Sequence, residues 1–378
     1  MIRYLREIDK QWQRRVWPNQ RQLLVNARTA MNYGTIAPIV EKLQNDPRIQ
    51  LYFTASEDPA NTAQIYSDAR QPFKLVTPLA AAFMRFDAYL ASDFLWVKLP
   101  RGTRRVQTFH GVAGKYRTIY DSPNQSMRAW DRLYFINEHR MRHFIETGAI
   151  DADSSAARLI GMPKLDCLVD GSLTRDQVLT SLGIEPSRKT VMYAPTWSPY
   201  SSLATMGEEL VKALGDAGYA VIGKLHDRSR ETRYVNSGGI DWGARLEPLL
   251  RSTGGVLATG ANSSAYLPGA DALITDHSSV GFEYLLLDRP LIRIEVPELI
   301  AKTDIEPIYV QLLSRASTSA LSVKEVVSAV EHAFAEPQHK SEARRAVANE
   351  MFYKPGGATS RAVAETYALL ELEPLVSH

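Results

Sequence analysis

The sequence is poor in cysteine, with a single residue, Cys167, that cannot form a disulfide within the chain. It has no uninterrupted stretch of about 20 apolar residues, the length that a membrane-spanning helix needs. Its start also lacks the uncharged apolar core that follows the basic residues of a secretory signal. These absences argue against a membrane span and against secretion, and they favour a reducing, cytoplasmic compartment.

Net charge is nearly absent as well, because 44 Lys and Arg face 42 Asp and Glu, which leaves a formal charge of +2. A nucleic-acid partner is therefore not expected, and any membrane contact must rest on a local patch. What the sequence does have is length and apolar content. Its 378 residues are 45% hydrophobic and 23% charged, which suits a globular protein with two domains of about 150 to 200 residues each.

Residues 1–19 form one such charged patch. Ile2, Leu5, Trp12 and Val16 repeat with the period of a helix and predict one apolar face. The basic residues of this segment are Arg3, Arg6, Lys10, Arg14 and Arg15. A basic amphipathic helix of this kind can bind an anionic membrane surface. The alternative is that it docks on its own domain and keeps its basic face in water.

Beyond residue 19, short apolar runs alternate with helical patterns, which is typical of parallel sheets with crossover helices and predicts an α/β fold. The strands expected in the first half are 23–26, 49–54, 88–91, 106–109, 133–136 and 158–160. Those expected in the second half are 191–194, 220–225, 255–258, 272–275 and 291–295. Thr174 and Gln177 have the spacing of a capping box, and Thr359 is the expected cap of the last helix.

These patterns predict four segments. An amphipathic helix occupies 1–19, a Rossmann-like domain 20–172, and a second Rossmann-like domain 173–345. Residues 346–378 are expected to end in a helix that packs back on the first domain.

Polar motifs follow five of the expected strands. Ligands of open parallel sheets bind outside the carboxyl ends of the strands, so the chemistry is sought in these motifs. They are Gln107-Thr108-Phe109-His110-Gly111, Gly161-Met162-Pro163-Lys164-Leu165-Asp166, Ala194-Pro195-Thr196-Trp197, Lys224-Leu225-His226 and Thr275-Asp276-His277-Ser278-Ser279-Val280-Gly281-Phe282-Glu283.

In order and spacing, these motifs resemble those of the CDP-glycerol glycerophosphotransferase family, the teichoic-acid and capsule polymerases. The resemblance is strong over residues 100–300 and implies a GT-B fold, in which two facing Rossmann-like domains enclose a cleft. The chain has Val112-Ala113-Gly114 where the family usually has Thr-Pro-Leu, Asp227 where it has Pro, and His277 where it has Tyr. The chain is similar to the transferase part alone, without the long N-terminal extension of many of these polymerases.

The resemblance and the chemistry of imidazole together point to His110 and His226 as catalytic residues. An imidazole can take a proton from an attacking hydroxyl near neutral pH, and Gly111 lets the backbone beside His110 approach a ligand closely. His226 would donate to a phosphate oxygen or protonate the leaving phosphate. The alternatives are a buried, hydrogen-bonded histidine at position 110 and a surface histidine at position 226.

The resemblance assigns the donor phosphates to the turn formed by Thr275, Asp276, Ser278 and Ser279. A helix N-terminus and serine hydroxyls both donate hydrogen bonds to anions, which fits a diphosphate. Helix capping is the alternative explanation for Asp and Ser at this place.

The remaining candidates surround the nucleotide and the acceptor. Glu283 would accept hydrogen bonds from ribose hydroxyls, and the alternative is a solvated helix position. Pro195, Thr196 and Lys224 would line the nucleotide pocket, although an ordinary turn explains the first two as well. Gly111 and Lys115 would lie on the acceptor side. The resemblance implies this placement, because the family motif that begins with the first histidine includes both positions.

Other signals carry no function. Gly218–Lys224 has the spacing of a phosphate-binding loop, but Leu225 replaces the required Ser or Thr. His139 and His143 are four residues apart but lack the adjacent glutamate of a helical metal motif. No metal site and no cofactor are therefore expected; a divalent ion is compatible with phosphoryl transfer, but no motif indicates one.

The function expected from the resemblance is transfer of glycerol phosphate, or a related alditol phosphate, from a CDP-activated donor to a hydroxyl of a glycan or lipid-linked acceptor. CMP would be released, and the product would be a cell-wall or capsule polymer made at the inner face of the cell membrane. Three alternatives stay open: a GT-B glycosyltransferase that uses a nucleotide sugar, an isomerase similar to nucleotide-sugar 2-epimerases, and a nucleotide-binding relative without catalysis.

Overall fold

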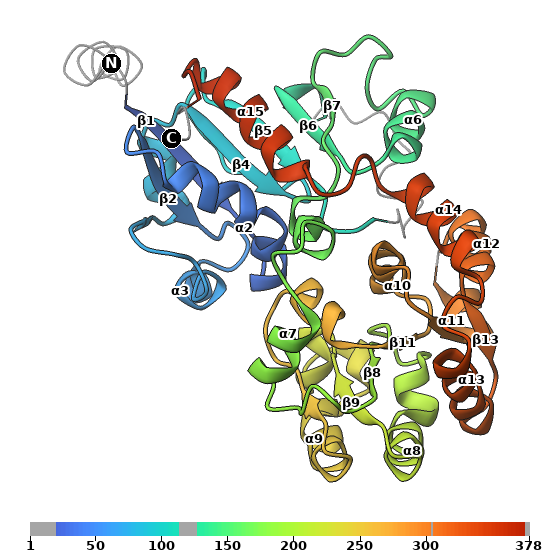
Figure 1. The fold of residues 1–378 in the computed structure, drawn as a ribbon. Helices are drawn as coiled ribbons and strands as arrows, with labels where there is room; N and C mark the ends of the chain where they lie inside the picture. The colour runs from blue at the N-terminus through green and yellow to red at the C-terminus, as the bar shows by residue number, and fades with distance from the viewer. Residues whose placement is uncertain (1–19, 113–126, 304, 375–378) are drawn as a thin grey trace. The chain divides into compact units, whose positions relative to one another are not determined.

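The computed structural model describes residues 20–112, 127–303 and 305–374 (Figure 1). These residues form two compact units. The described part of unit 1 comprises residues 20–110, 127–166 and 353–374, and that of unit 2 comprises 111–112, 167–303 and 305–352. The predictions for residues 1–19 and for Lys115 lie outside the described residues.

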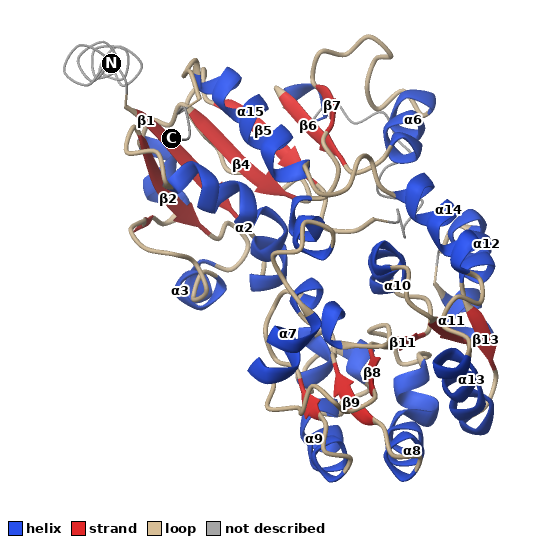
Figure 2. Ribbon diagram, in the orientation of Figure 1, coloured by secondary structure: helices blue, strands red, loops and turns tan. Residues whose placement is uncertain are grey.

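Unit 1 is built on a seven-stranded sheet in the order β3-β2-β1-β4-β5-β6-β7, and every pairing in it is parallel. Its strands are β1 (Arg21–Asn26), β2 (Ile49–Thr54), β3 (Lys74–Leu75), β4 (Ala88–Ser92), β5 (Arg104–Thr108), β6 (Arg132–Phe135) and β7 (Ala157–Leu159). Its helices are α2 (Ala30–Gln44), α3 (Thr62–Ile65), α4 (Pro78–Phe83), α6 (Glu138–Glu146) and α15 (Ala358–Leu370). Helices flank the sheet (Figure 2).

Unit 2 repeats this plan with a six-stranded parallel sheet in the order β10-β9-β8-β11-β12-β13. Its strands are β8 (Thr190–Tyr193), β9 (Ala220–Gly223), β10 (Val256–Leu257), β11 (Ala272–Thr275), β12 (Leu291–Ile294) and β13 (Thr318–Ala320). Its helices are α7 (Arg175–Ser181), α8 (Ser202–Asp216), α9 (Trp242–Ser252), α10 (Ser279–Tyr284), α11 (Pro297–Lys302), α12 (Pro307–Ala316), α13 (Val323–Ala335) and α14 (Ser341–Met351).

Both sheets therefore contain the strand order 3-2-1-4-5-6 of a Rossmann fold, and unit 1 adds a seventh strand at its edge. The expected α/β class with two Rossmann-like units is confirmed. The strand order reverses direction between β1 and β4 in unit 1 and between β8 and β11 in unit 2. Ligands of doubly wound sheets bind at the carboxyl ends of the strands beside this reversal. Binding residues are therefore expected at the carboxyl edge of each sheet.

Each unit has its own apolar core. In unit 1, Leu23 and Val25 of β1 and Phe53 of β2 are fully buried with side chains of α2 and with Tyr367 and Leu370 of α15. In unit 2, a separate cluster joins inward side chains of β8, β9, β11 and β12 to helices α8, α9 and α13. Strands that are buried on both faces read as continuous apolar runs, which is why the sequence located them.

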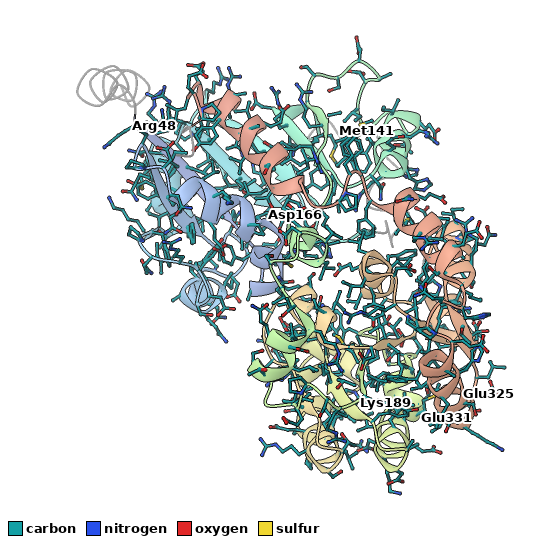
Figure 3. The ribbon with its side chains drawn as sticks, viewed as in Figure 1. Arg48, Met141, Asp166, Lys189, Glu325 and Glu331 are labelled. Atoms are coloured by element: carbon teal, nitrogen blue, oxygen red, sulfur yellow. The ribbon has the colours of Figure 1, made fainter. Side chains whose placement is uncertain are left out.

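Unit 1 is completed by α15, which comes after unit 2 in the sequence. The chain re-enters unit 1 at Tyr353, whose amide donates to the carbonyl of Ile136 over 3.0 Å. Asp166, labelled in Figure 3, accepts hydrogen bonds from the amides of Ala358 (3.1 Å) and Thr359 (2.7 Å). The expectation that Thr359 caps this helix was wrong, because Thr359 lies inside the first turn and a carboxylate from another segment satisfies the free amides.

Candidate active site

At the carboxyl edge of the unit 1 sheet, the His110 ring contacts the Asp93 carboxylate. His110 follows β5 and Asp93 follows β4, and these two strands are neighbours. Nδ1 of His110 lies 2.5 Å from Oδ2 of Asp93, and the amide of His110 donates to Oδ1 of Asp93 over 3.3 Å. The His110 side chain is 47% exposed, so one edge of the ring is held by the carboxylate while the ring still reaches solvent.

Asp93 is itself fixed from a third strand end. Asn32, in the first turn of α2 after β1, donates from Nδ2 to Oδ2 of Asp93 over 2.6 Å. Thr29 caps the same helix and donates to Oδ1 of Asn32 over 2.8 Å. The hydrogen-bonded sequence Thr29, Asn32, Asp93, His110 therefore gathers residues from the ends of β1, β4 and β5.

Electrostatics keep the Asp93 carboxyl ionised. Burial acts to raise its pKa, but the charge of His110, the hydrogen bonds from His110 and the charge of Arg140 together outweigh burial, so that the pKa of Asp93 lies below its usual value. A buried carboxylate that stays charged is suited to stabilise a positive charge on the histidine beside it.

The backbone at this place adopts an uncommon conformation. Asp93 and Phe94 have φ values of 54° and 57°, in the left-handed region that bulky residues rarely adopt. The Phe94 amide is held by Oε1 of Gln107 over 2.7 Å. The Phe94 ring packs against Phe109 at a centroid distance of 5.6 Å. The surrounding contacts thus enforce a strained turn that points the Asp93 carboxylate at His110.

This geometry defines the proton that the histidine can move. In a neutral His110, Nδ1 donates to Asp93, which leaves the lone pair on Nε2 to accept a proton. Sequence reasoning found His110 but missed Asp93, Asn32 and Thr29. The signal for Asp93 was present, since it is the first polar charged residue after the buried strand 88–92.

His226 occupies a matching position in unit 2, but its Nδ1 faces a hydrogen-bond donor where Nδ1 of His110 faces a carboxylate. It follows β9, and its Nδ1 accepts a hydrogen bond from the amide of Arg228 over 3.2 Å. A neutral imidazole that accepts at Nδ1 carries its proton on Nε2. His226 is therefore arranged to donate from Nε2, whereas His110 is arranged to accept there.

Aromatic and cationic groups surround His226. The Trp197 ring, just after β8, lies parallel to the His226 ring at 5.0 Å with an interplanar angle of 12°. Tyr234 meets Trp197 edge-on at 5.8 Å. The Arg228 guanidinium lies over both rings, 5.2 Å from the Trp197 centroid and 4.9 Å from that of Tyr234. These contacts fix the plane of the His226 ring, and sequence reasoning assigned no role to Tyr234 or Arg228.

Thr275, the last residue of β11, and Asp276, which follows it, are turned inward. Both are 0% exposed. Asp276 accepts from the amide of Thr196 over 2.8 Å and from the amide and hydroxyl of Ser202 over 3.1 and 3.0 Å. Thr275 donates from Oγ1 to the carbonyl of Ala194 over 2.6 Å. Their polar side-chain atoms hold the loop after β8 against the loop after β11.

Ser278 and Ser279 begin α10 at the same edge and are partly exposed. Ser278 is the N-cap, and its hydroxyl lies 3.5 Å from the amide of Val280, a long capping bond. Glu283, later in α10, is only 2% exposed and accepts from the hydroxyl of Ser264 over 3.2 Å. The alternative that Glu283 is a solvated helix position is therefore wrong.

Three other predicted residues lie at the same edge of the sheet in unit 2, and Gly111 follows β5 of the unit 1 sheet. Pro195 is buried and Thr196 is partly exposed. Lys224 is 7% exposed, and its Nζ donates to the carbonyl of Leu225 over 2.9 Å and lies 3.9 Å from Asp227. Burial raises the pKa of Asp227, with Lys224 and Arg230 acting against it. Gly111, which directly follows His110, is partly exposed.

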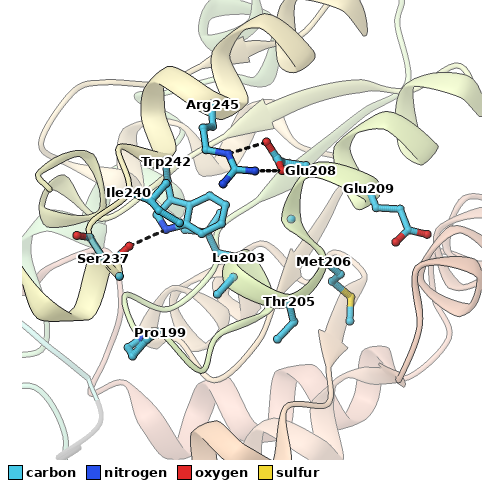
Figure 4. A pocket seen from close by; sticks show the side chains of 13 residues that line it. Pro199, Leu203, Thr205, Met206, Glu208, Glu209, Ser237, Ile240, Trp242 and Arg245 are labelled. Carbon is cyan, nitrogen blue, oxygen red and sulfur yellow. Dashed lines mark hydrogen bonds and ion pairs between the residues drawn. The ribbon is translucent and has the colours of Figure 1, made fainter.

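A cavity of about 360 Å³ in unit 2 lies apart from these residues. It opens between α8 and α9, and Trp242 forms part of its wall (Figure 4). The Trp242 indole donates to the carbonyl of Ser237 over 3.1 Å, and Arg245 pairs with Glu208 at its edge. None of the predicted site residues lines this cavity. The arrangement at the strand ends is thus the stronger candidate for chemistry.

Two Rossmann-like units, each with a histidine at the carboxyl edge of its sheet, define the chain as a GT-B-like protein. The chain belongs to the CDP-glycerol:poly(glycerophosphate) glycerophosphotransferase family, whose model matches residues 22–367. The resemblance seen in the sequence motifs is confirmed. Among the described residues, no helix combines the length and apolar character needed to cross a membrane.

Individual relatives agree with this family. A teichoic acid poly(glycerol phosphate) polymerase of Staphylococcus epidermidis is 28% identical over an alignment of 214 residues, and the match covers 53% of this chain and 26% of the relative. The match thus spans about a quarter of that relative's length.

Solved structures agree on the fold. A structure of the wall teichoic acid polymerase TagF covers 98% of this chain and 97% of its own, with a TM-score of 0.70 and 18% identity. A putative UDP-N-acetylglucosamine 2-epimerase from Listeria monocytogenes covers 94% and 98%, with a TM-score of 0.58 and 13% identity.

Proposed function

We propose that the chain transfers glycerol phosphate, or a related alditol phosphate, from CDP-glycerol to a hydroxyl of a glycan or lipid-linked acceptor, with release of CMP. The observation that carries this proposal is the family match over residues 22–367, because it takes in both strand edges at which the polar groups gather. The His110–Asp93 pair supports it independently, since phosphoryl transfer to a hydroxyl needs a base.

In the proposed reaction, the acceptor oxygen attacks the β-phosphorus of the donor and forms a new P–O bond. The bond from that phosphorus to the bridging oxygen breaks, and CMP leaves with the electron pair. The hydroxyl proton passes to Nε2 of His110. The resulting imidazolium is stabilised by Asp93, 2.5 Å from Nδ1.

Unit 2 is proposed to bind the donor. His226 would donate from Nε2 to a phosphate oxygen, and the Ser278 and Ser279 hydroxyls would donate to the diphosphate. We assign Asp276 and Thr275 a positioning role, because their side-chain polar atoms are engaged within the fold.

The nucleotide contacts follow from the same edge. Thr196, Pro195 and the adjacent Trp197 would line the pocket for the nucleoside. Glu283 and Lys224 would act from behind it, since both are buried and hydrogen-bonded within the fold. Gly111 and Lys115 are proposed for the acceptor side.

The domain roles and the location are part of the proposal. Residues 20–172 would form the acceptor-side domain, 173–345 the donor-binding domain, and 346–378 the closing helix on the first domain. The basic segment 1–19 would place the enzyme on the inner face of an anionic membrane, where a lipid-linked or polymeric acceptor of the cell wall or capsule is made.

The test is product identity. The full chain is mixed with radiolabelled CDP-glycerol, CDP-ribitol and UDP-sugars, each with a glycerol phosphate-primed acceptor, and the nucleotide released is identified by chromatography. CMP from a CDP-alditol supports the proposal. A nucleoside diphosphate would show a glycosyltransferase, an epimerised sugar nucleotide would show an isomerase, and the absence of turnover with intact CDP binding would show a non-catalytic relative.

A further inference from the structure

Three potential metal ligands meet where α13 ends in unit 2. His332 lies in the last turn of this helix, Glu336 is its C-cap, and His339 follows three residues later. One ligand atom from each lies within 4.8 Å of the other two. The two imidazole rings are 5.1 Å apart and nearly perpendicular, at 71°. Within the described residues this is the one group of His, Cys, Asp and Glu with such proximity.

We propose that His332, Glu336 and His339 bind a divalent transition-metal ion, with zinc as the best match. Two imidazoles and one carboxylate are the ligands that zinc accepts readily, whereas magnesium and calcium prefer oxygen ligands throughout. Three protein ligands leave a fourth position for water. This site is separate from the strand-end residues and independent of the proposed transfer reaction.

The backbone brings the three side chains together. The amide of Glu336 donates to the carbonyl of His332 over 2.8 Å, which continues the helical spacing and places both side chains on one face. The amide of His339 donates to the carbonyl of Glu336 over 2.9 Å, which folds the chain back after Pro337. The ligand spacing is thus set by main-chain hydrogen bonds and persists without a metal.

The side chain of a buried arginine holds this turn through hydrogen bonds. Arg344 is 1% exposed and donates to the carbonyls of Pro337 (2.9 Å) and His339 (2.5 Å). Its Nε donates to Asp288 over 2.9 Å, so the guanidinium is already neutralised by a carboxylate. A turn that is ordered beforehand loses less conformational entropy when a metal binds.

Nearby lysine and arginine side chains also have partners within the fold. Nζ of Lys340 donates to the carbonyl of Ser317 over 2.6 Å, and Arg345 pairs with Asp288 at 3.2 Å. The three candidate ligands are exposed, so metal has access and the side chains can rotate. In a tetrahedral site with Zn–N distances of about 2.0 to 2.1 Å, ligand atoms lie about 3.4 Å apart, so closing the present spacing requires a shift on the order of 1 Å.

A metal at this place would tie the end of α13 to the segment that leads into α14. An ion that binds the folded state and not the unfolded chain raises stability by mass action. The structure thus predicts a stabilising metal clamp.

The test uses the full chain, prepared without a histidine tag and stripped with a chelator. Zn²⁺ binding is measured by calorimetry, and Co²⁺ binding by its visible absorption. We expect one Zn²⁺ per chain with micromolar affinity, the intense visible bands of four-coordinate Co²⁺, and a rise in Tm on adding Zn²⁺. The variant Glu336→Gln should weaken binding at least tenfold, and His332→Asn with His339→Asn should abolish it.

The matched control is His139→Asn with His143→Asn, which removes the partly exposed histidine pair on α6. This variant should bind Zn²⁺ as the parent does. The proposal is overturned if the His332/His339 variant keeps the parent stoichiometry and affinity, or if only the α6 variant loses binding. The Tm of each variant without metal should equal that of the parent, because the three side chains are exposed; a lower metal-free Tm would instead show a packing role and would also count against the proposal.

Discussion

At the scale of single residues, the proposed reaction depends most directly on Asp93 and His110. Asp93→Asn should lower kcat by about a hundredfold with little change in KM. A general base contributes a factor of about 10² to 10⁴ to the rate, and an uncharged amide at position 93 would neither orient the His110 ring correctly nor stabilise its positive charge. Steady-state kinetics with CDP-glycerol is the measurement. Combining Asp93→Asn with His110→Ala should cost little more than His110→Ala alone, because the two residues act as one unit. If the losses in kcat of the two single variants add up in the double variant, the two residues act independently.

Asp93 should also leave a signature in acid stability. Its pKa is lowered in the folded state, so its contribution is fully present above the unfolded value of about 3.9 and is lost as the pH falls through the lower folded value. Between about pH 5 and pH 3, the free energy of unfolding of the parent should therefore fall more than that of Asp93→Asn. Urea titrations at each pH measure the difference, and parallel curves would contradict the lowered pKa of Asp93.

His226 allows its two ring nitrogens to be tested separately. Asn at this position can place an oxygen near the Nδ1 site and accept from the Arg228 amide, whereas Gln can place an amide donor near the Nε2 site. We expect His226→Asn to fold with an unchanged Tm and lose about a hundredfold in turnover, as for loss of a phosphate-stabilising donor. His226→Gln should keep more activity. If Asn retains more activity than Gln, the Nδ1 contact and not the Nε2 donor matters.

The polar residues at the ends of the strands could be predicted from the sequence, but which of their side chains face a ligand could not. His110, His226, Asp276 and Thr275 all follow apolar runs, yet Asp276 and Thr275 are fully buried while His110 is half exposed. The spacing of residues along one strand does not show which hydrogen bonds join the loops that follow two neighbouring strands. Asp93 was missed for the same reason, since its importance lies in its distance to His110.

At the scale of elements, the first turn of α10 is the proposed diphosphate site. The double change Ser278→Ala and Ser279→Ala should weaken CDP binding by about 1 to 3 kcal/mol, the range for losing hydrogen bonds to a charged group. Cytidine binding should change little. Calorimetry with both ligands is the measurement, and equal losses would show that these serines only cap the helix.

The matched control is Ser322→Ala. Ser322 caps α13 through the amide of Glu325 at 3.3 Å and belongs to no part of the proposed site. This variant should lower Tm slightly, as loss of an N-cap does, and leave CDP binding unchanged.

Most strands were predicted to within a few residues, but two short strands at the sheet edges were missed. The expected strands 49–54 and 272–275 coincide with β2 and β11, and the capping box of Thr174 and Gln177 is present at α7. The missed strands are β3 and β13, which have two and three residues at the sheet edges and contain no apolar run. The cap of α15 was missed because its carboxylate comes from Asp166, 192 residues earlier in the chain.

At the scale of the whole molecule, the segment 1–19 is proposed to carry the enzyme to a membrane. A chain that starts at Gln20 should lose sedimentation with anionic vesicles, because each of five basic residues contributes about 1 kcal/mol near such a surface. Binding of the full chain should fall with salt. The shortened chain should retain turnover on a small soluble acceptor. If it aggregates or unfolds instead, the segment belongs to the core of its domain.

The division of unit 1 has a consequence for synthesis on the ribosome. Almost all of unit 2 is one continuous stretch, whereas unit 1 needs α15, which is translated after it. Tyr367 and Leu370 then fill places in a core whose strands emerged more than 200 residues earlier. Unit 2 can thus reach its native packing while unit 1 still waits for its last helix, the reverse of the N-terminal-first order usual for chains of consecutive domains. A released chain that ended at residue 352 would contain all of unit 2 but would lack the helix that covers part of the apolar sheet face of unit 1.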